Sequence, residues 1–409
     1  LPILAFTPPS HWGHVSLSWA LLRGCTIGSV KILVVAESFL PHMNGVTNSV
    51  LRVVECFALS GHEVRIVAPG APGIPNELTF GAERVPIIPV LSIPMMGYGQ
   101  VRMSATTNYR IRSIIDDFHP DVVHLACPAL LGNAASKAAV KRGIPTVAIY
   151  QTDLPGYTRK YGAPVLEEAM WMFLRDIHNR CEVNLAPSSS TRNQIVEHGI
   201  ERVQIWRRGV DTSQFSPSRR SDELRERLAP NGEKLVVYVG RLAAEKQVED
   251  LAVLESLPNV RLVIVGEGPL EAELRAAMPG AYFAGFKKGA ELAEIVATCD
   301  LFVHTGELET FCQTIQEAMA SGLPAIAPRS GGPIDLIDHS RTGWLYTPGE
   351  LDELRAYVED LLGDDTKREH FAAAAQDSVR QRTWPVLAEQ LLGFYREAAR
   401  VHEASAQAA

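Results

Sequence analysis

Two glutamates, Glu309 and Glu317, lie eight positions apart in the segment "GELETFCQTIQEAMASGLPAIAP", residues 306–328. Glu309 follows an apolar run, whereas Glu317 falls inside a helix predicted to begin between Thr310 and Gln313. The first N–H groups of a helix have no partner within it, so they favour a phosphate group or a hydroxyl oxygen. Carboxylates placed directly on a diphosphate would repel it, but they can accept hydrogen bonds from hydroxyl groups at its two ends, at about 1.5–3 kcal/mol each. In isolation, the pair is also explained as a loop acid and a helix-surface acid.

Two cations occur in a similar position in the segment "YVGRLAAEKQVEDL". Arg241 directly follows an apolar strand, and Lys246 lies five residues later in a loop before a helix predicted from Val248. Such cations suit a diphosphate, Arg as a planar fork and Lys as a point charge. Taken alone, this loop would be explained as solvated surface. Together with the two glutamates it favours a sugar nucleotide with one carboxylate at each end.

A third loop, "ESFLPHMNGVTNSV", follows the first apolar strand and contains Asn44 and Gly45 before a helix predicted from Thr47. Gly45 lets a ligand approach the backbone closely, and the helix start again favours an anion. A tight turn would also explain the glycine. We expect this loop and the two loops of the second half to face one cleft.

The elements that must position these loops alternate regularly from Lys31 onward. Short, wholly apolar runs of the buried parallel-strand kind are separated by helical segments, first in "KILVVAES" and again in "KLVVYVGRL". This alternation predicts an α/β protein with two Rossmann-like, doubly wound parallel-sheet domains that face a cleft. The predicted units are a disordered extension at 1–29, an acceptor domain at 30–210, a nucleotide-sugar domain at 211–385 and a packing helix at 386–409.

Composition fits a two-domain globular protein, because 46% of the 409 residues are hydrophobic and 21% are charged. The net charge is −8, and the first domain has only a weak positive excess, so nucleic acid is not an expected partner. The six cysteines show no paired spacing for zinc or disulfides, which favours a reducing cytoplasm. No run of 18 apolar residues predicts a membrane span.

Several segments together resemble the retaining glycosyltransferases of family 4, which have the GT-B fold. They are the glutamate pair with "AMASGLPAIA", the segments "GRLAAEK", "GEGP" and "RRGVD", and the glycine loop after the first strand. The resemblance covers residues 30–395. Within the family, "VVAESFLPHMNGVTNSVLRV" and "YQTDLPGY" look like the actinobacterial GDP-mannose-dependent α-mannosyltransferases that build membrane glycolipids. This implies a GDP-mannose donor, a lipid-linked acceptor, no metal cofactor and peripheral contact with the inner face of the plasma membrane.

The resemblance also implies roles for individual residues. Glu309 would bind a hydroxyl group of the donor sugar, and Glu317 would bind the ribose hydroxyls. Arg241 and Lys246 would hold the diphosphate and stabilise it as a leaving group, while Gly45 would lie against the phosphates. Backbone amides at the helix start would contact the sugar or phosphate; they belong to Phe311, Cys312, Gln313 and Thr314.

Three positions depart from the family pattern. Gln151 stands where many members carry a sugar-contacting His, so a proton-carrying role there is in doubt. Asn44 replaces the first glycine of a commoner pair, and Asp335 replaces a commoner Glu. Asp153, beside Gln151, is a candidate catalytic residue that would orient the acceptor hydroxyl, but a solvent-exposed loop acid explains it equally well.

Other residues have simpler explanations. His124, His304 and Cys312 are expected to be structural, with no redox role for the thiol. The apolar residues 171–174 fit core packing, although a membrane-surface patch for a lipid acceptor is a second interpretation.

Alternative functions differ in donor or in chemistry. A family 4 enzyme with a UDP-sugar donor is the main alternative, because contacts to ribose and diphosphate do not read the base. A two-lobed sugar-binding protein without turnover is a more remote one; it would need export, and residues 1–29 have no basic segment ahead of their apolar run. A nicotinamide dehydrogenase is disfavoured because "GEGPLE" lacks the third glycine of G-x-G-x-x-G.

Overall fold

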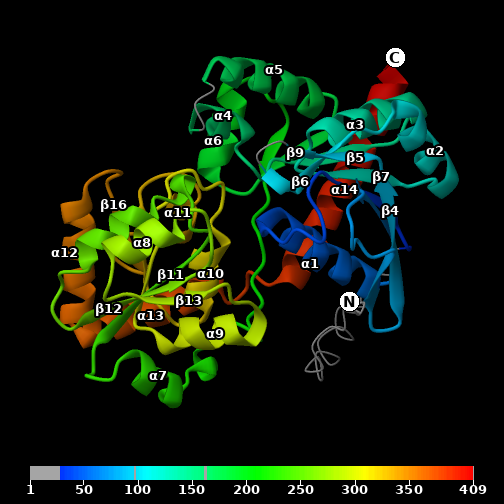
Figure 1. Ribbon diagram of the computed structural model, residues 1–409. Helices are drawn as coiled ribbons and strands as arrows, with labels where there is room; N and C mark the ends of the chain where they lie inside the picture. The colour runs from blue at the N-terminus through cyan, green and yellow to red at the C-terminus, as the bar shows by residue number, and fades with distance from the viewer. Residues whose placement is uncertain (1–27, 96–97, 161–163, 409) are drawn as a thin grey trace.

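The structure is a computed structural model that describes residues 28–95, 98–160 and 164–408. Most of the predicted extension, residues 1–27, lies outside the described residues. The remainder forms two lobes, each built on a parallel sheet covered by helices (Figure 1). This confirms the predicted doubly wound α/β architecture.

The first sheet has eight strands in the order β10-β9-β8-β7-β1-β2-β4-β3, and every neighbouring pair is parallel except β3 with β4. Its strands are β1 (Lys31–Ala36), β2 (Glu63–Pro69), β3 (Glu77–Phe80), β4 (Glu83–Val90), β7 (Val122–Ala126), β8 (Thr146–Ile149), β9 (Val183–Ala186) and β10 (Val203–Ile205). Its helices are α1 (Gly45–Leu59), α2 (Asn108–Phe118), α3 (Leu130–Arg142), α4 (Leu154–Lys160), α5 (Glu167–His178) and α6 (Ser189–Glu197). A separate hairpin, β5 (Ser92–Met95) and β6 (Tyr98–Ser104), was not predicted.

Strand β1 shows why these apolar runs become central strands. Ile32 and Val34 pack into one hydrophobic cluster with α1, whereas Leu33 and Val35 pack into a second cluster with α2 and α3 on the other face. Because both faces are buried, the strand has no polar alternation.

The second sheet has six parallel strands in the order β13-β12-β11-β14-β15-β16. Its strands are β11 (Lys234–Val239), β12 (Val260–Val265), β13 (Tyr282–Gly285), β14 (Leu301–Val303), β15 (Ala325–Pro328) and β16 (Gly343–Tyr346). Its helices are α7 (Asp222–Leu228), α8 (Glu271–Ala277), α9 (Gly289–Thr298), α10 (Gln313–Ala320), α11 (Pro333–Leu336), α12 (Leu351–Gly363) and α13 (Asp365–Val379).

The segment predicted as a helix from Val248 is instead a 3₁₀ helix, Val248–Leu254. Its buried residues, Val248, Leu251 and Leu254, recur every three positions. That spacing matches the three residues per turn of a 3₁₀ helix rather than the 3.6 of an α-helix. The three side chains therefore lie on the same buried face only in a 3₁₀ helix.

The last helix, α14 (Trp384–Ala408), leaves the second lobe and packs against α1 of the first lobe (Figure 1). Leu391 and Tyr395 are buried in the first lobe's core cluster, and the Tyr395 hydroxyl lies 2.6 Å from Nδ1 of His124. His124 is therefore a core histidine, and burial lowers its pKa to about 3.

Candidate active site

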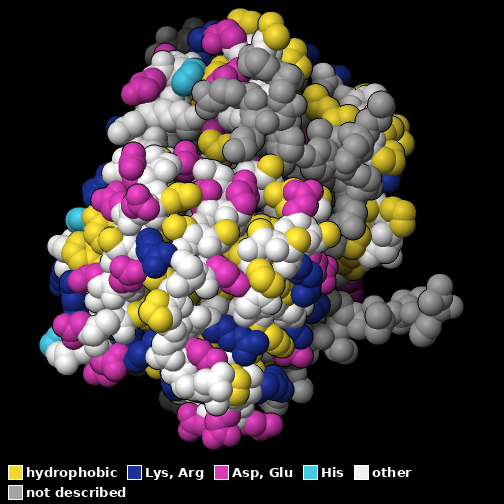
Figure 2. Space-filling view, turned by 60° about the vertical axis from the view of Figure 1, so that its left-hand side comes forward, with side chains coloured by type: hydrophobic (Ala, Val, Ile, Leu, Met, Phe, Trp, Pro, Cys, Tyr) yellow, Lys and Arg dark blue, Asp and Glu magenta, His cyan; other side chains and the backbone are white. Residues whose placement is uncertain are grey.

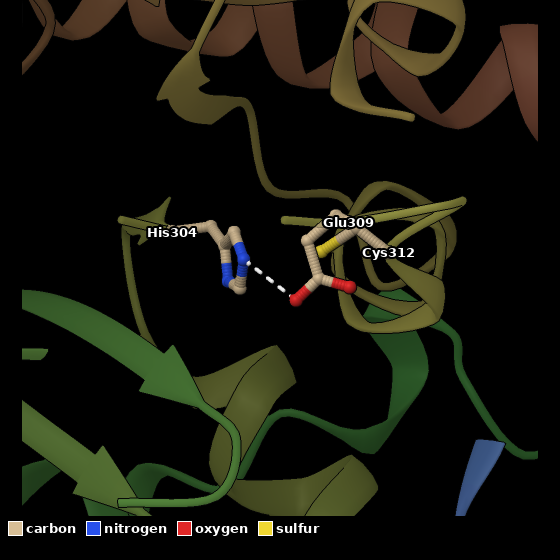
Figure 3. A group of neighbouring side chains, drawn as sticks. All are labelled: His304, Glu309 and Cys312. Atoms are coloured by element: carbon tan, nitrogen blue, oxygen red, sulfur yellow. Dashed lines mark ion pairs between the residues drawn. The ribbon is translucent and has the colours of Figure 1, made fainter. Parts of the chain in front are cut away.

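The loops after β11 and β14 bring Lys246 and Glu309 into direct contact. The Lys246 ammonium forms an ion pair with Oε1 of Glu309, and these side chains are only 19% and 14% exposed. His304, at the end of β14, places Nε2 3.1 Å from the same carboxylate oxygen. Figure 3 shows the His304 ring and the Glu309 carboxylate pointing toward each other, with the Cys312 sulfur beside them. Residues 63 positions apart thus meet because β11 and β14 are neighbouring parallel strands.

Electrostatics keep this carboxylate ionised. Burial alone would raise the pKa of Glu309, but Lys246 and His304 outweigh burial and hold that pKa well below its ordinary value. Burial would lower the pKa of His304, yet the Cys312 sulfur and the Glu309 carboxylate raise it to about 9. Two cationic groups therefore flank one anion at neutral pH.

His304, Glu309 and Cys312 also form the kind of set that can hold a metal ion, with ligand atoms within 4.8 Å of one another. Nitrogen, oxygen and sulfur donors of this kind suit zinc. The oxygen of Glu309 that faces His304 is, however, the one that contacts the Lys246 ammonium. A cation could bind there only after Lys246 had left, so the arrangement fits a metal poorly.

Arg241 lies at the same edge of the sheet and is 46% exposed. It forms an ion pair with Glu245, whose own side chain is almost fully buried. Glu245 was not recognised in the sequence, although its i,i+4 spacing from Arg241 was a signal.

Glu317 lies on α10, half-buried, close to Arg52 of α1 and to Asp211. Nη2 of Arg52 lies 3.3 Å from Oδ2 of Asp211. Burial raises the pKa of Glu317 to about 7, with a partial opposing effect from Gln313 and Arg52. This glutamate therefore changes its charge near neutral pH, unlike Glu309.

The start of α10 carries the four residues predicted to offer backbone amides. Cys312 is the N-cap and has a left-handed conformation, φ 69°, which is uncommon for any residue but glycine. Thr314 Oγ1 lies 3.6 Å from the Cys312 sulfur, and Nε2 of Gln313 donates to the Gly209 carbonyl at 3.0 Å. Phe311 is buried. No acidic residue occupies the first turn of this helix, so its positive end is uncompensated there.

In the glycine loop of the first lobe, α1 begins at Gly45, two residues earlier than the predicted start at Thr47. Asn44 is the N-cap, and its side chain accepts a hydrogen bond from the Thr47 amide at 2.9 Å. A Cβ on Gly45 would lie 2.8 Å from Nη1 of Arg208. The absence of a side chain at residue 45 therefore makes room for a guanidinium group.

Gln151 and Asp153 are both buried at the end of β8. The Gln151 carbonyl accepts from the Thr310 hydroxyl at 2.9 Å, which joins the two lobes. Asp153 is not the solvent-exposed acid that one interpretation expected. Its carboxylate accepts from the Tyr150 hydroxyl at 3.1 Å and from the Gly156 amide at 3.0 Å.

Arg208 is another charged residue of this region to which the sequence patterns assigned no individual role. It is only 6% exposed, and Nη2 donates to Oε1 of Gln151 at 3.0 Å. Its guanidinium carbon lies 6.0 Å from the centre of the Phe311 ring. The sequence offered no means of telling it from its neighbour Arg207, because burial of one of two adjacent arginines is a tertiary property.

A cavity of about 390 Å³ lies between the lobes. One wall comprises Asp153 and residues of α6, including Asn193 and Glu197; the other comprises residues 307–310 with Ser330 and Gly331. The wall groups are mostly hydroxyls, amides and carboxylates, which suits a ligand rich in hydroxyl groups.

The apolar residues 171–174 divide between two environments. Trp171 and Leu174 are buried, as core packing predicts, whereas Met172 is 51% exposed. Val165 and Leu166, which precede α5, are 90% and 57% exposed. Across the described ranges, no helix has the length and hydrophobicity needed to cross a membrane.

Comparison with known proteins places both lobes in known families. Residues 43–214 match the model described as Glycosyltransferase Family 4, and residues 220–378 match Glycosyl transferases group 1. The chain is 46% identical over 370 residues to a GDP-mannose-dependent alpha-mannosyltransferase of Mycobacterium tuberculosis, covering 90% of this chain and 96% of the relative. It is 44% identical over 376 residues to the protein of that name from Corynebacterium glutamicum, covering 91% and 90%.

The solved structures include Anabaena HepE in complex with UDP and glucose. It superposes with a TM-score of 0.71 at 20% identity, covering 89% of this chain and 99% of HepE. At that identity the likeness shows the fold alone, which is the predicted GT-B arrangement.

Proposed function

Because this chain belongs to Glycosyltransferase Family 4, we propose that it transfers mannose from GDP-mannose, with retention of the α configuration, to a hydroxyl group of a membrane glycolipid or phospholipid headgroup. The observation that carries the donor assignment is the 44–46% identity, over about nine-tenths of the chain, to relatives named GDP-mannose-dependent alpha-mannosyltransferases. The charge arrangement at the edge of the second sheet supports the same donor class.

In the proposed complex, the diphosphate lies between the positive start of α10 and the two cations that follow β11. Arg241 and Lys246 hold the phosphate oxygens, with Lys246 leaving Glu309 as the donor enters. Glu309 then accepts a hydrogen bond from a mannose hydroxyl, and Glu317 accepts from the ribose hydroxyls. Gly45 lies against the phosphates, with Asn44 fixing the start of α1.

Amides at the start of α10 complete the donor site. Those of Phe311, Cys312, Gln313 and Thr314 face the sugar and phosphate. The left-handed conformation of Cys312 turns the chain into the helix at this point, which supports such a role.

The transfer needs no nucleophile from the protein. The bond between C1 of mannose and the phosphate oxygen breaks while the acceptor oxygen bonds to C1 from the same face. The acceptor proton passes to the departing phosphate oxygen, which gives GDP and an α-mannoside. Such a reaction asks the protein to position its substrates and to neutralise the leaving group.

The interlobe cavity is the proposed acceptor site. Asp153 lies on its wall, and its remaining lone pairs can accept a hydrogen bond from the acceptor hydroxyl. Gln151, engaged with Arg208, contacts the sugar without carrying a proton. The polar lining supports a headgroup with several hydroxyl groups.

Contact with a membrane surface is part of the proposal. Val165, Leu166 and Met172 expose apolar side chains around the start of α5, and Arg175 on the same helix is exposed. Such a combination suits peripheral binding to an anionic lipid surface. The free thiols of Cys56, Cys127, Cys181, Cys299 and Cys312 support a reducing compartment, hence the cytoplasmic face.

A donor screen tests the function. The purified protein is incubated with a lipid extract and radiolabelled GDP-mannose, UDP-glucose or UDP-GlcNAc, and the lipid product is digested with α-mannosidase. The proposal predicts label transfer from GDP-mannose alone, release of that label by the α-mannosidase, and an unchanged rate in EDTA. Transfer from a UDP-sugar but not from GDP-mannose would overturn the donor assignment; binding of free mannose without any transfer would overturn the reaction.

A further inference from the structure

Arg208 lies in the strand-free segment after β10, where the chain passes from the first lobe toward the second. Its guanidinium contacts both lobes, because Gln151 and Gly45 belong to the first and Phe311 to the second. The Arg208 carbonyl accepts a hydrogen bond from Nε2 of Gln316 in α10 at 3.0 Å. The side chain is therefore fixed where the start of α1 meets the start of α10.

Among the described residues, this buried cation has no carboxylate within ion-pair distance, and the Glu309 carboxylate acts on it only from farther away. Within the described part of the chain its side chain has one hydrogen-bond partner, the neutral amide of Gln151, and its buried Nε has none. Burial lowers the pKa of Arg208 to about 10, which still leaves it protonated at neutral pH. Burying a charge without a partner of opposite sign costs several kcal/mol, so its retention calls for a ligand that supplies one.

The neighbouring cations each have an acidic partner. Lys246 is paired with Glu309, and Arg241 with Glu245. Arg207, adjacent in sequence, is 3.4 Å from Asp335. Of these four cations, Arg208 is the one for which the described residues supply no carboxylate at ion-pair distance; the Glu309 carboxylate, already paired with Lys246, acts on it only from farther away.

Two helix starts reinforce that charge. Gly45 begins α1 and Gln313 begins α10, and neither helix has an acidic residue in its first turn. The positive dipole ends of both helices lie near Arg208. In α1, Gly45 faces the Arg208 guanidinium, and in α10 the Gln313 side chain donates to the carbonyl of the next residue, Gly209. Such a concentration of positive potential favours a polyanion over a neutral sugar.

We propose that Arg208 is a third donor-binding cation, whose guanidinium binds the donor's diphosphate at the interface of the two lobes and stabilises it as it departs. This inference rests on the proposed donor class but assigns a residue beyond Arg241 and Lys246. Since the side chain contacts both lobes, it also couples diphosphate binding to the position of one lobe relative to the other. A guanidinium group can donate to two phosphate oxygens at once, which a lysine cannot reproduce.

Calorimetric titration of GDP and of guanosine distinguishes ligand binding from a structural role. For Arg208→Gln we expect GDP affinity to fall by at least about 30-fold, while guanosine affinity changes by less than about threefold, because guanosine lacks the phosphates. Arg208→Lys, which keeps the charge but not the fork, should fall between the wild-type protein and Arg208→Gln. The matched control, Arg207→Gln, should retain the wild-type ratio of GDP to guanosine affinity.

A second measurement, chemical rescue of the transfer rate, is used if a substituted protein folds poorly. Added guanidinium ion should restore part of the transfer rate of Arg208→Ala, and methylammonium at the same concentration should restore less. Equal losses of GDP and guanosine affinity in Arg208→Gln, or no rescue in a folded Arg208→Ala, would overturn the inference. Failure of the wild-type protein to bind GDP at all would instead contradict the donor class proposed above.

Discussion

At the scale of single residues, Lys246 and Glu309 form an ion pair at the edge of the second sheet. His304 approaches the same carboxylate oxygen as Lys246 does. A diphosphate would compete with Glu309 for the ammonium and so release the carboxylate for a sugar hydroxyl. One exchange of partners would therefore prepare the diphosphate and sugar contacts of the proposed donor site.

Removal of that ammonium tests the exchange. Lys246→Ala should lower the transfer rate by about 10²–10³-fold, because the leaving group loses a preorganised charge. The variant should still fold but melt at a lower temperature, because the largely buried Glu309 carboxylate keeps His304 but loses its lysine partner. Lys287→Ala, which removes an i,i+4 surface partner of Glu291, is the matched control and should keep the wild-type rate. A near-wild-type rate for Lys246→Ala would remove it from the site.

Glu317 gives the site a pH dependence. Burial raises its pKa to about 7, so at pH 6 only about one molecule in ten carries the ionised form. If the ribose hydroxyls bind the carboxylate, binding of GDP-mannose, whose diphosphate has no ionisation near pH 7, must release a proton below pH 7. Affinity should rise about tenfold per pH unit up to about pH 7 and then level off.

Calorimetry in buffers of different ionisation enthalpy measures that released proton, and Glu317→Gln should abolish it. The effect of pH on folding stability through Glu317 has the opposite sign to its effect on affinity. A carboxyl group whose pKa is raised on folding favours the folded state at low pH, and that contribution is lost as the pH rises through about 7. A GDP-mannose affinity independent of pH between 5.5 and 7.5 would contradict the assignment of Glu317 to the ribose.

At the scale of elements, the sequence predicts much of the framework because buried parallel strands are apolar on both faces. The sequence does not predict features that depend on contacts between elements far apart in the chain. A helix was predicted from Val248 without a type, and the period of three in Val248, Leu251 and Leu254 fits the 3₁₀ helix found there. The helix after Trp384 was predicted, but whether it covers the first lobe, the second or both depends on tertiary contacts that no local pattern reveals.

The packing of α14 can be tested with a pair of substitutions. Leu391 is fully buried among residues of the first sheet and its helices, whereas Val386 on the same helix is 46% exposed. Leu391→Ala should lower the free energy of unfolding of the first lobe by about 2–5 kcal/mol, while Val386→Ala should change it by less than about 0.5 kcal/mol. Urea unfolding followed by tryptophan fluorescence measures both, because Trp206 and Trp384 lie in the same core cluster as Leu391 and Trp206 donates to the Leu387 carbonyl at 2.8 Å. Equal shifts for the two variants would contradict this packing.

The site residues show the same division between local and tertiary information. Arg241, Lys246 and Glu309 were predicted because they lie in loops that follow apolar strands, and Glu317 because of its spacing from Glu309 within the next helix. Arg208 was not predicted, because only its burial distinguishes it from Arg207.

At the scale of the whole molecule, acidic and basic side chains are interspersed on the face seen in Figure 2. A uniform basic surface is therefore not what would bring this face to a membrane. The exposed apolar residues before and on α5 are a more specific candidate, because each can leave water on contact with lipid.

Sedimentation with vesicles of mixed anionic and zwitterionic phospholipid tests that candidate. Val165→Glu combined with Leu166→Glu should reduce the bound fraction at least about tenfold, because burial of each such side chain contributes about 1.5–3 kcal/mol. Phe286→Glu, which alters a 57% exposed residue of the second lobe, is the control and should bind normally. If both proteins bind equally well, the contact surface lies elsewhere.

The central claim is that this cleft holds a sugar nucleotide with cations on its diphosphate and a carboxylate at each end. A crystal structure with GDP-mannose tests it most directly. We expect the Lys246 ammonium to have moved from Glu309 to a phosphate oxygen, Glu309 to accept from a mannose hydroxyl and Glu317 to accept from the ribose. A nucleotide bound elsewhere, with the Lys246–Glu309 ion pair intact and Glu317 without a ligand contact, would contradict the account.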